Sequence, residues 1–349
     1  MAELEDLDLG KLMGHRRRTV SLAAEELVRR RPLFEDQALP SLIEPAVAGV
    51  DLAAWAAANK ELVESELSRA GGILFRGFDL PDVAAFQGVI RALYGELLEY
   101  SDRVQPRTVV SSKIYSSTEY PPDQHIELHN ESAYAATWPL RIAFFCMLPS
   151  ETGGQTPIAD CRRVLARIPA AVGERFRRLG VMYVRNFGDG FGISWQTAFQ
   201  TDDRAEMEEF CRKNGVSLEW KEDGRLRTRS VRPVVVRHPG TGEMVWFNAA
   251  VSSHISTVEP KVREALLSEF ATDELPKNSF WGDGSELEPE VLAELREAYR
   301  AETVAFLWQR GDVLLLDNML AAHGRAPYTG PRKLVVGMAM ACNVSDVEA

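Results

Sequence analysis

Cysteine is scarce in this chain of 349 residues, and no CxxC pair occurs. The four cysteines are widely scattered, at Cys146, Cys161, Cys211 and Cys342. That pattern argues against a disulfide framework or a cysteine-based zinc cluster, and it is typical of reduced thiols in the cytoplasm. We therefore expect a cytoplasmic protein.

Long apolar runs are also lacking. No stretch approaches the roughly 18 consecutive apolar residues that indicate a membrane-spanning helix. The first residues, MAELEDLDLGKL, are acidic and contain no apolar core before a cleavage site. We expect neither a signal peptide nor a membrane partner.

Positive charge is in deficit, with 40 Lys and Arg against 51 Asp and Glu, which gives a net charge of −11. This balance argues against a surface for nucleic acid or for an anionic membrane. With 45% hydrophobic and 26% charged residues, the composition is that of an ordinary globular protein.

The segment HIELHNESAYAATWP contains two HxE patterns, His125/Glu127 and His129/Glu131. Residues at positions i and i+2 of a β-strand point to the same face, so either pair can present an imidazole and a carboxylate to one metal ion. Such pairs also arise by chance in many chains. We favour His129/Glu131 because the motifs that follow are better spaced from it.

A third ligand is expected far downstream, in GDVLLLDNMLAAHGRAPYTGPRKLVV. There Asp312 to Leu316 predicts a strand, and His323 stands at the start of the next loop or strand. Two imidazoles and one carboxylate form the facial triad of non-haem Fe(II) oxygenases, which leaves coordination positions open.

Arg332 follows His323, and its planar guanidinium is suited to pair with a carboxylate of a dicarboxylate co-substrate. Thr156, in GGQTPIAD, could donate a hydrogen bond to the same carboxylate, although it could equally belong only to the turn after Gly153 and Gly154. Two other classes remain open, a zinc hydrolase and a non-catalytic cupin-like binding protein. The zinc hydrolase would leave Arg332 and Thr156 without a role, and the complete set of residues argues against the binding protein.

Apolar periodicity predicts a mixed, β-rich α+β chain. The predicted helices span residues 52–70, 83–94, 161–180, 203–214, 259–269 and 289–300. The predicted strands lie at residues 72–78, 142–147, 181–185, 231–237, 244–248, 312–316 and 334–341. An early metal dyad and a late third ligand fit a double-stranded β-helix (a jelly-roll, cupin-like core) with flanking helices. We expect an N-terminal arm over residues 1–40 and a single domain over residues 41–349, with a large insert at about 160–300.

The chain resembles the TauD/TfdA family of Fe(II)/2-oxoglutarate-dependent dioxygenases, and within it the syringomycin-biosynthesis-type (SyrP-like) branch of amino-acid hydroxylases. The resemblance covers all but roughly the first forty residues. It is carried by GGILFRGF, LHNESAY, FFCMLPSETGGQTPIAD, SWQTAFQTDD, HPGTGEMVWFN, WGDGSELE and GDVLLLDNMLAAHGRAPYTGPRKLVV.

By this resemblance His129, Glu131 and His323 are the catalytic iron ligands, and Thr156 and Arg332 bind the C5 carboxylate of 2-oxoglutarate. A second arginine found in many relatives is replaced by the apolar run Val335-Val336-Gly337. Arg325 is a candidate to replace it at the C1 carboxylate. Halogenases of the superfamily carry a small residue in place of the carboxylate ligand, so Glu131 favours hydroxylation.

The resemblance implies that Fe(II), 2-oxoglutarate and O2 are used to hydroxylate an amino acid, either free or attached to a carrier protein, in natural-product biosynthesis. Desaturation, epoxidation or cyclisation are alternative outcomes of the same chemistry. We expect His254 to have a structural role, and His15 and His238 to lie on the surface. The weaker candidates for substrate contacts are Ser112, Tyr115, Tyr134, Arg185, Asn248 and Arg325.

Overall fold

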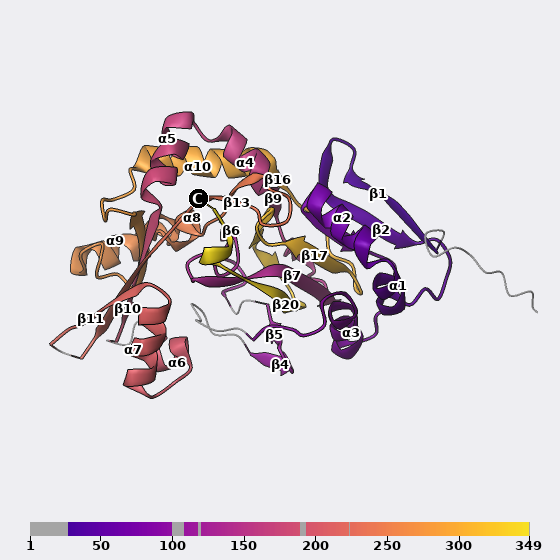
Figure 1. Cartoon of the computed structure of the whole chain (residues 1–349), viewed down its shortest axis with the longest axis horizontal. Coiled ribbons are helices and arrows are strands. Elements are labelled where there is room, and N and C mark those ends of the chain that lie inside the picture. The colour runs from indigo at the N-terminus through magenta and orange to yellow at the C-terminus, as the bar shows by residue number, and fades with distance from the viewer. Residues whose placement is uncertain (1–26, 100–107, 118–119, 189–192, 223, 349) are drawn as a thin grey trace, which may run out of the picture.

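The computed structural model describes residues 27–99, 108–117, 120–188, 193–222 and 224–348 (Figure 1). Among these residues, no helix is long and apolar enough to cross a membrane. The predicted N-terminal arm lies mostly outside this range, as does His15.

The centre of the fold is an eight-stranded sheet in which β7 lies between β17 and β20, antiparallel to both. Phe144 and Phe145, consecutive residues of β7, are both buried, because the pleat directs them to opposite faces and both faces are covered. The strands, in spatial order, are β1 (Val28–Phe34), β2 (Gln37–Pro45), β3 (Gly72–Phe75), β17 (Val313–Asp317), β7 (Thr137–Leu148), β20 (Lys333–Asn343), β5 (Ile114–Ser116) and β4 (Val109–Ser111).

A second sheet of four short strands packs on one face of the large sheet. Ile158 and Ala321 of the second sheet share a hydrophobic cluster with Phe144, Leu314 and Val336 of the first. The four strands are, in spatial order, β16 (Thr303–Val304), β9 (Ile158–Asp160), β18 (Ala321–Arg325) and β6 (Ile126–His129). A separate two-stranded sheet is formed by β8 (Thr152–Gly153), which precedes β9 in the chain, and β19 (Tyr328–Thr329), which follows β18. These two layers form the predicted jelly-roll core.

Three helices cover the other face of the large sheet. They are α1 (Leu52–Ala58), α2 (Lys60–Ala70) and α3 (Val83–Tyr94). Asp51 and Asp82 accept hydrogen bonds from backbone N–H groups of the first turns of α1 and α3, and Gly71 ends α2 in a left-handed conformation. The expected helix over 52–70 is thus two helices, which meet at Asn59.

Residues between β9 and β16 form a separate layer on the side of the core opposite α1 and α2 (Figure 1). Its four-stranded sheet has the order β11-β12-β10-β15, with every neighbouring pair antiparallel. The strands are β10 (Val181–Phe187), β11 (Val216–Trp220), β12 (Leu226–Arg232) and β15 (Lys277–Trp281), with a hairpin of β13 (Val235–Arg237) and β14 (Met244–Trp246). The helices are α4 (Cys161–Arg167), α5 (Ala170–Leu179), α6 (Trp195–Phe199), α7 (Arg204–Lys213), α8 (Ala250–Ser253), α9 (Pro260–Glu269) and α10 (Pro289–Glu302).

Two of the strands missed from the sequence, β1 and β12, are polar. In β1 and β12, arginines and serines occupy positions that period-two hydrophobicity would leave apolar, so no strand pattern stands out. Because β1 and β2 pair along residues 28–45, the expected boundary at residue 40 falls inside β2. The last part of the expected arm, residues 28–40, therefore belongs to the main sheet.

Candidate metal and co-substrate site

The two predicted histidine ligands come from neighbouring strands. β18 pairs antiparallel with β6, and His323 lies directly opposite His129 in this register. The imidazole centroids are 4.7 Å apart. Two residues far apart in the chain thus present their rings to one point because their strands are adjacent.

Glu131 lies just past the end of β6, in a turn, and not on the strand as the i, i+2 argument assumed. Its carboxylate still reaches the histidines, and Oε2 lies 3.8 Å from Nε2 of His323. Asn318 fixes this turn. The Asn318 side chain accepts a hydrogen bond from the Glu131 N–H at 2.7 Å and donates one to the Glu131 carbonyl at 2.9 Å.

The ligand atoms of His129, Glu131 and His323 all lie within 4.8 Å of one another. Nδ1 of His129 lies 2.8 Å from the Glu127 carbonyl, and this contact assigns the ring proton to Nδ1 and leaves Nε2 for a metal. Two nitrogens and one carboxylate fit Fe(II), and both Glu131 and His323 are buried.

The alternative HxE pair does not join this group. The side chain of His125 is 47% exposed, and its Nε2 lies 3.8 Å from the Glu127 carboxylate. That carboxylate also lies 4.0 Å from Arg296. The structure therefore brings together the pair that we favoured, whereas the other pair faces outward.

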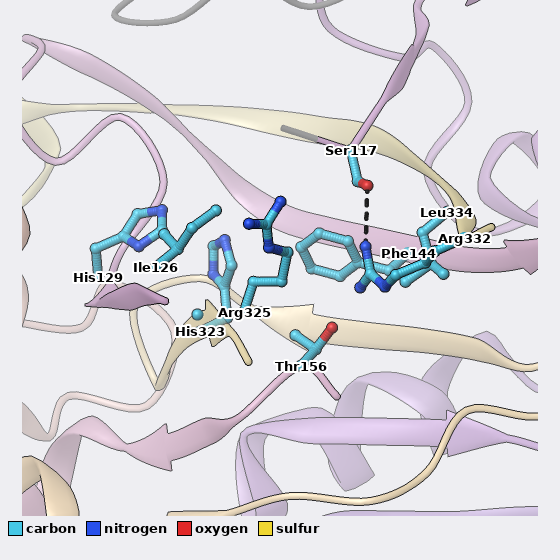
Figure 2. A pocket seen from close by; sticks show the side chains of 10 residues that line it. Ser117, Ile126, His129, Phe144, Thr156, His323, Arg325, Arg332 and Leu334 are labelled. Atoms are coloured by element: carbon cyan, nitrogen blue, oxygen red, sulfur yellow. Dashed lines mark hydrogen bonds between the residues drawn. The ribbon is translucent and has the colours of Figure 1, made fainter. Parts of the chain in front are cut away.

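A pocket opens beside the histidines, and its lining contains both residues expected at the 2-oxoglutarate carboxylate. Figure 2 shows His129 and His323 at one end and Arg332 with Ser117 at the other. The lining residues are Ser117, Ile126, His129, Phe144, Thr156, His323, Gly324, Arg325, Arg332 and Leu334.

Arg332 is held in place by uncharged partners. Its Nε donates to the Gly154 carbonyl at 3.1 Å, and Nη1 lies 3.5 Å from Oγ of Ser117. Burial, and then the nearby charge of Arg325, lower the pKa of Arg332 to about 10, so the guanidinium remains charged at neutral pH. This partly buried cation has no carboxylate partner among the described residues and is ready to receive an anion.

Thr156 accepts a hydrogen bond from the Trp308 indole at 3.2 Å, which leaves the hydroxyl proton available to a ligand. Glycine is required at positions 153 and 154 because the backbone there lies very close to the segment that carries Arg332. A Cβ at Gly153 would lie 2.1 Å from the Pro327 carbonyl, and one at Gly154 would lie 3.1 Å from the Arg332 side chain; both glycines have positive φ. The GGQT sequence thus brings Thr156 beside the arginine.

Arg325 lines the same pocket, but its terminal nitrogens are already engaged. They donate to the carbonyls of Tyr120, Pro121 and Gln124. Nε is buried and has no hydrogen-bond partner among the described residues. Arg325 therefore ties the segment before β6 to β18, and only Nε remains for a co-substrate.

Three of the weaker substrate candidates lie outside this pocket. Ser112 is exposed in the turn between β4 and β5, where its carbonyl accepts a hydrogen bond from Gln87. Tyr115 is buried in the cluster between the two core sheets. Asn248 is buried, and its backbone exchanges hydrogen bonds with Asn130, which supports the turn that carries Glu131.

The other two candidates lie together on the insert side. The Arg185 guanidinium is centred 5.9 Å from the Tyr134 ring, and Tyr134 follows Glu131 in the same turn.

His238 is not on the surface as expected. It is 2% exposed, and its Nε2 lies 3.0 Å from Asp317, which also pairs with Arg141. The sequence HPGTGE looks like an exposed turn, and nothing in it reveals the distant carboxylate. His254 has the expected structural role, because its Nδ1 accepts a hydrogen bond from the Ser256 N–H.

Sequence reasoning missed the supporting residues Ser117, Trp308, Asn130 and Asn318. The one available signal was DN in DNMLAAHGR, where an Asn ending a buried strand predicts side-chain bonds to nearby backbone. Ser117 and Trp308 belong to no motif, and only the fold brings them to the pocket.

Comparison with known proteins agrees with this geometry. The family model described as "Taurine catabolism dioxygenase TauD, TfdA family" matches residues 35–338. The dapdiamide synthesis protein DdaC of Enterobacter agglomerans is 39% identical over 276 residues, which cover 79% of this chain and 84% of that protein. A clavaminate synthase-like protein of Arabidopsis thaliana is 29% identical over 335 residues, covering 91% and 98% of the two chains.

Among solved structures, PvcB of Pseudomonas aeruginosa superposes with a TM-score of 0.56 over 91% of this chain and 93% of that one. PvcB is described as an Fe, alpha-ketoglutarate-dependent oxygenase of an isonitrile synthetic pathway. At 17% identity, this likeness establishes the fold, and it confirms the predicted jelly-roll architecture.

Proposed function

This chain belongs to the TauD/TfdA family of dioxygenases, and we propose that it hydroxylates an unactivated C–H bond of an amino acid or of an aminoacyl group held on a carrier protein. The family match extends over most of the chain. It confirms the class predicted from the sequence, an Fe(II)- and 2-oxoglutarate-dependent dioxygenase that uses O2.

The roles proposed for individual residues rest on one observation, which is that these residues meet at a single pocket. His129, Glu131 and His323 converge within 4.8 Å, and His129 and His323 line the same pocket as Thr156 and Arg332. A hydrolytic metal site has no use for a guanidinium beside its ligands, whereas a dicarboxylate co-substrate can pair with one.

Each residue then has a defined task. His129 and His323 would each offer a ring nitrogen, and Glu131 a carboxylate oxygen, to the metal, and Asn318 holds the backbone of Glu131. Bound iron with 2-oxoglutarate supplies the oxidising power for attack on a C–H bond. The apolar walls formed by Ile126, Phe144 and Leu334 keep water away from the co-substrate.

The substrate class rests on the relative at 39% identity, whose name places it in dapdiamide synthesis. This supports an amino-acid-like substrate and a role in natural-product biosynthesis. Glu131 occupies the position that halogenases of the superfamily leave small, which supports hydroxylation. The four cysteines are buried and form no disulfide among the described residues, which supports the expected cytoplasmic location.

The test is iron-dependent formation of succinate from 2-oxoglutarate in the presence of free amino acids and of aminoacyl groups loaded on carrier proteins, with mass analysis of the product. Hydroxylation adds the mass of one oxygen atom. Loss of two hydrogens would instead indicate desaturation or ring closure, and absence of iron-dependent succinate from every mixture would contradict the proposal.

A further inference from the structure

A second cavity, of about 430 Å³, lies in the insert between α9, α10 and β15. Cavities that hold small molecules in proteins have volumes in this range. None of the residues that line it also lines the pocket beside the metal ligands. The cavity is therefore a separate site, and the proposed hydroxylation gives it no role.

One buried side chain holds the walls of this cavity together. Asn278 of β15 is 2% exposed, and its Oδ1 accepts a hydrogen bond from the Ile255 N–H at 3.0 Å. Its Nδ2 donates to the Thr272 carbonyl at 3.2 Å. These bonds join β15 to the short helix η3 (Ile255–Thr257) and to the segment after α9, so the cavity is preformed.

Three basic side chains of the lining meet at Ser256. Nη2 of Arg296 donates to Oγ of Ser256 at 2.5 Å, and Nη1 of Arg263 donates to the Ser256 carbonyl at 3.4 Å. Nδ1 of His254 lies 2.8 Å from the same Oγ. Because all three contact one residue, two guanidiniums and an imidazole are gathered at one side of the cavity.

The two guanidiniums carry positive charge that the described residues do not neutralise. Arg263 has no ion-pair partner among them, and Arg296 only approaches the Glu127 carboxylate, at 4.0 Å. Glu286 is the one carboxylate in the described lining, and it accepts a hydrogen bond from the Thr272 hydroxyl at 2.8 Å. Two cations against one carboxylate leave the cavity with excess positive charge, which favours an anionic ligand.

His254 adds a neutral hydrogen-bond donor. Its Nδ1 accepts a hydrogen bond from the Ser256 N–H at 3.1 Å, which assigns the ring proton to Nε2. Burial, and then the charge of Arg296, lower the pKa of His254 to about 4, so the ring is uncharged at neutral pH. Nε2 has no hydrogen-bond partner among the described residues and is available to a ligand.

The rest of the lining is largely apolar. It includes Ile255, Leu267, Phe280, Leu287 and Leu292, all of which except Leu267 are buried. Apolar walls with a few polar groups on one side are typical of a site for a small molecule that has an apolar body and one polar group.

We propose that this cavity binds a small organic oxyanion, a carboxylate or a phosphate that carries an apolar body. The acid group pairs with Arg263 and Arg296, because a guanidinium matches the geometry of either oxyanion, and it accepts a hydrogen bond from Nε2 of His254. The body lies against the apolar walls. This inference goes beyond the proposed function, because it adds a ligand other than the metal and 2-oxoglutarate.

The test is calorimetric titration of the full-length protein, loaded anaerobically with Fe(II) and 2-oxoglutarate so that Arg332 is already engaged. The probes are hexanoate, 3-phenylpropanoate, hexyl phosphate and phenyl phosphate. The controls are hexanamide, 3-phenylpropanamide and inorganic phosphate. We expect one equivalent of an organic acid to bind and the amides not to bind, and the series that binds more tightly identifies the acid group.

Variants place the ligand in the cavity. Arg263→Gln and Arg296→Gln should each weaken binding of the acid about 10- to 100-fold, since each removes a hydrogen bond between charged groups. Glu286→Gln should strengthen binding, because it removes the carboxylate from the lining. The controls are Lys261→Met on α9 and Arg300→Gln on α10, which remove exposed charges outside the lining and should leave binding unchanged.

The inference is overturned if no organic acid binds, or if the amides or inorganic phosphate bind as tightly as the acids. It is also overturned if both arginine variants bind the acids as the wild type does. Glu286 is exposed, so Glu286→Gln keeps the test decisive even if an arginine variant does not fold. Unchanged or weaker binding in Glu286→Gln would contradict the proposal.

The proposed function stands apart from these results, since the residues assigned to it line the other pocket. Failure of Fe(II) and 2-oxoglutarate to bind in the loading step would contradict the proposed function instead. The same titrations of the unloaded protein would then still test the cavity.

Discussion

His323 of β18 lies directly opposite His129 of β6, and Nε2 of His323 is 3.8 Å from the carboxylate of Glu131. The register between two short strands therefore sets the separation of the two histidines proposed to bind the metal. A one-residue slip of either strand would turn one imidazole to the opposite face.

The first prediction concerns the choice of HxE pair. His129→Ala should lower Fe(II) affinity by more than about 100-fold, because even outer partners of metal ligands contribute 10- to 100-fold. His125→Ala should bind Fe(II) as the wild type does, since its side chain is 47% exposed and faces Glu127. Anaerobic calorimetric titration measures both. Loss of the metal in His125→Ala, with binding retained in His129→Ala, would identify the other pair as the ligands.

The second prediction concerns Arg332. Arg332→Ala should weaken 2-oxoglutarate binding by about 2–4 kcal/mol, the cost of removing one partner from a buried charged pair. Fe(II) affinity should change little, because Arg332 lies at the other end of the pocket (Figure 2). The KM for 2-oxoglutarate measures the effect, with the exposed Arg310→Ala as the control. An unchanged KM would remove Arg332 from the co-substrate site.

The third prediction separates positioning from stability. Asn318 is fully buried and makes side-chain bonds to both backbone groups of Glu131. Asn318→Ala should lower Fe(II) affinity about 10- to 100-fold through misplacement of that carboxylate. Asn214→Ala, which loses a side-chain bond in the insert, should lower the melting temperature without changing Fe(II) affinity. Equal Fe(II) affinity in wild type and Asn318→Ala would show that the turn holds Glu131 without Asn318.

The fourth prediction is a loss of stability in acid. Burial, and then the charge of Arg296, lower the pKa of His254 from 6.5 to about 4. The unfolded state therefore binds a proton at a pH where the folded state does not, so the free energy of unfolding should fall between pH 6.5 and about 4. The full shift corresponds to about 3 kcal/mol. Urea denaturation at pH 7 and pH 5 should give a smaller difference for His254→Gln than for wild type, and equal differences would contradict this assignment.

Much of this arrangement could be predicted from the sequence, for a physical reason. Apolar strands such as residues 142–147 and 312–316, and capped helices such as 83–94, are specified by local pattern, and they form where expected. The proposed metal triad follows from residue chemistry and spacing, whereas the glycines of GGQT are explained by close contacts with Pro327, Ser150 and Arg332 that only the fold shows.

The remainder depends on contacts between distant segments. Nε2 of His238 lies 3.0 Å from a carboxylate oxygen of Asp317, and the Trp308 indole donates a hydrogen bond to Thr156, through long-range packing that no local pattern encodes. The polar strand β12 is held by its two neighbours in the insert sheet, and not by hydrophobic alternation of its own. The meeting of Arg263, from α9, and Arg296, from α10, at Ser256 likewise has no sequence signal.

The most direct test of the central claim is anaerobic titration of the purified apoprotein with Fe(II) and then 2-oxoglutarate, followed by visible absorption. If His129, Glu131 and His323 hold the iron beside a 2-oxoglutarate anchored by Arg332, a weak charge-transfer band should appear and saturate at one equivalent. The band should be lost in His323→Ala. Metal binding without the band in the wild-type protein would contradict the account.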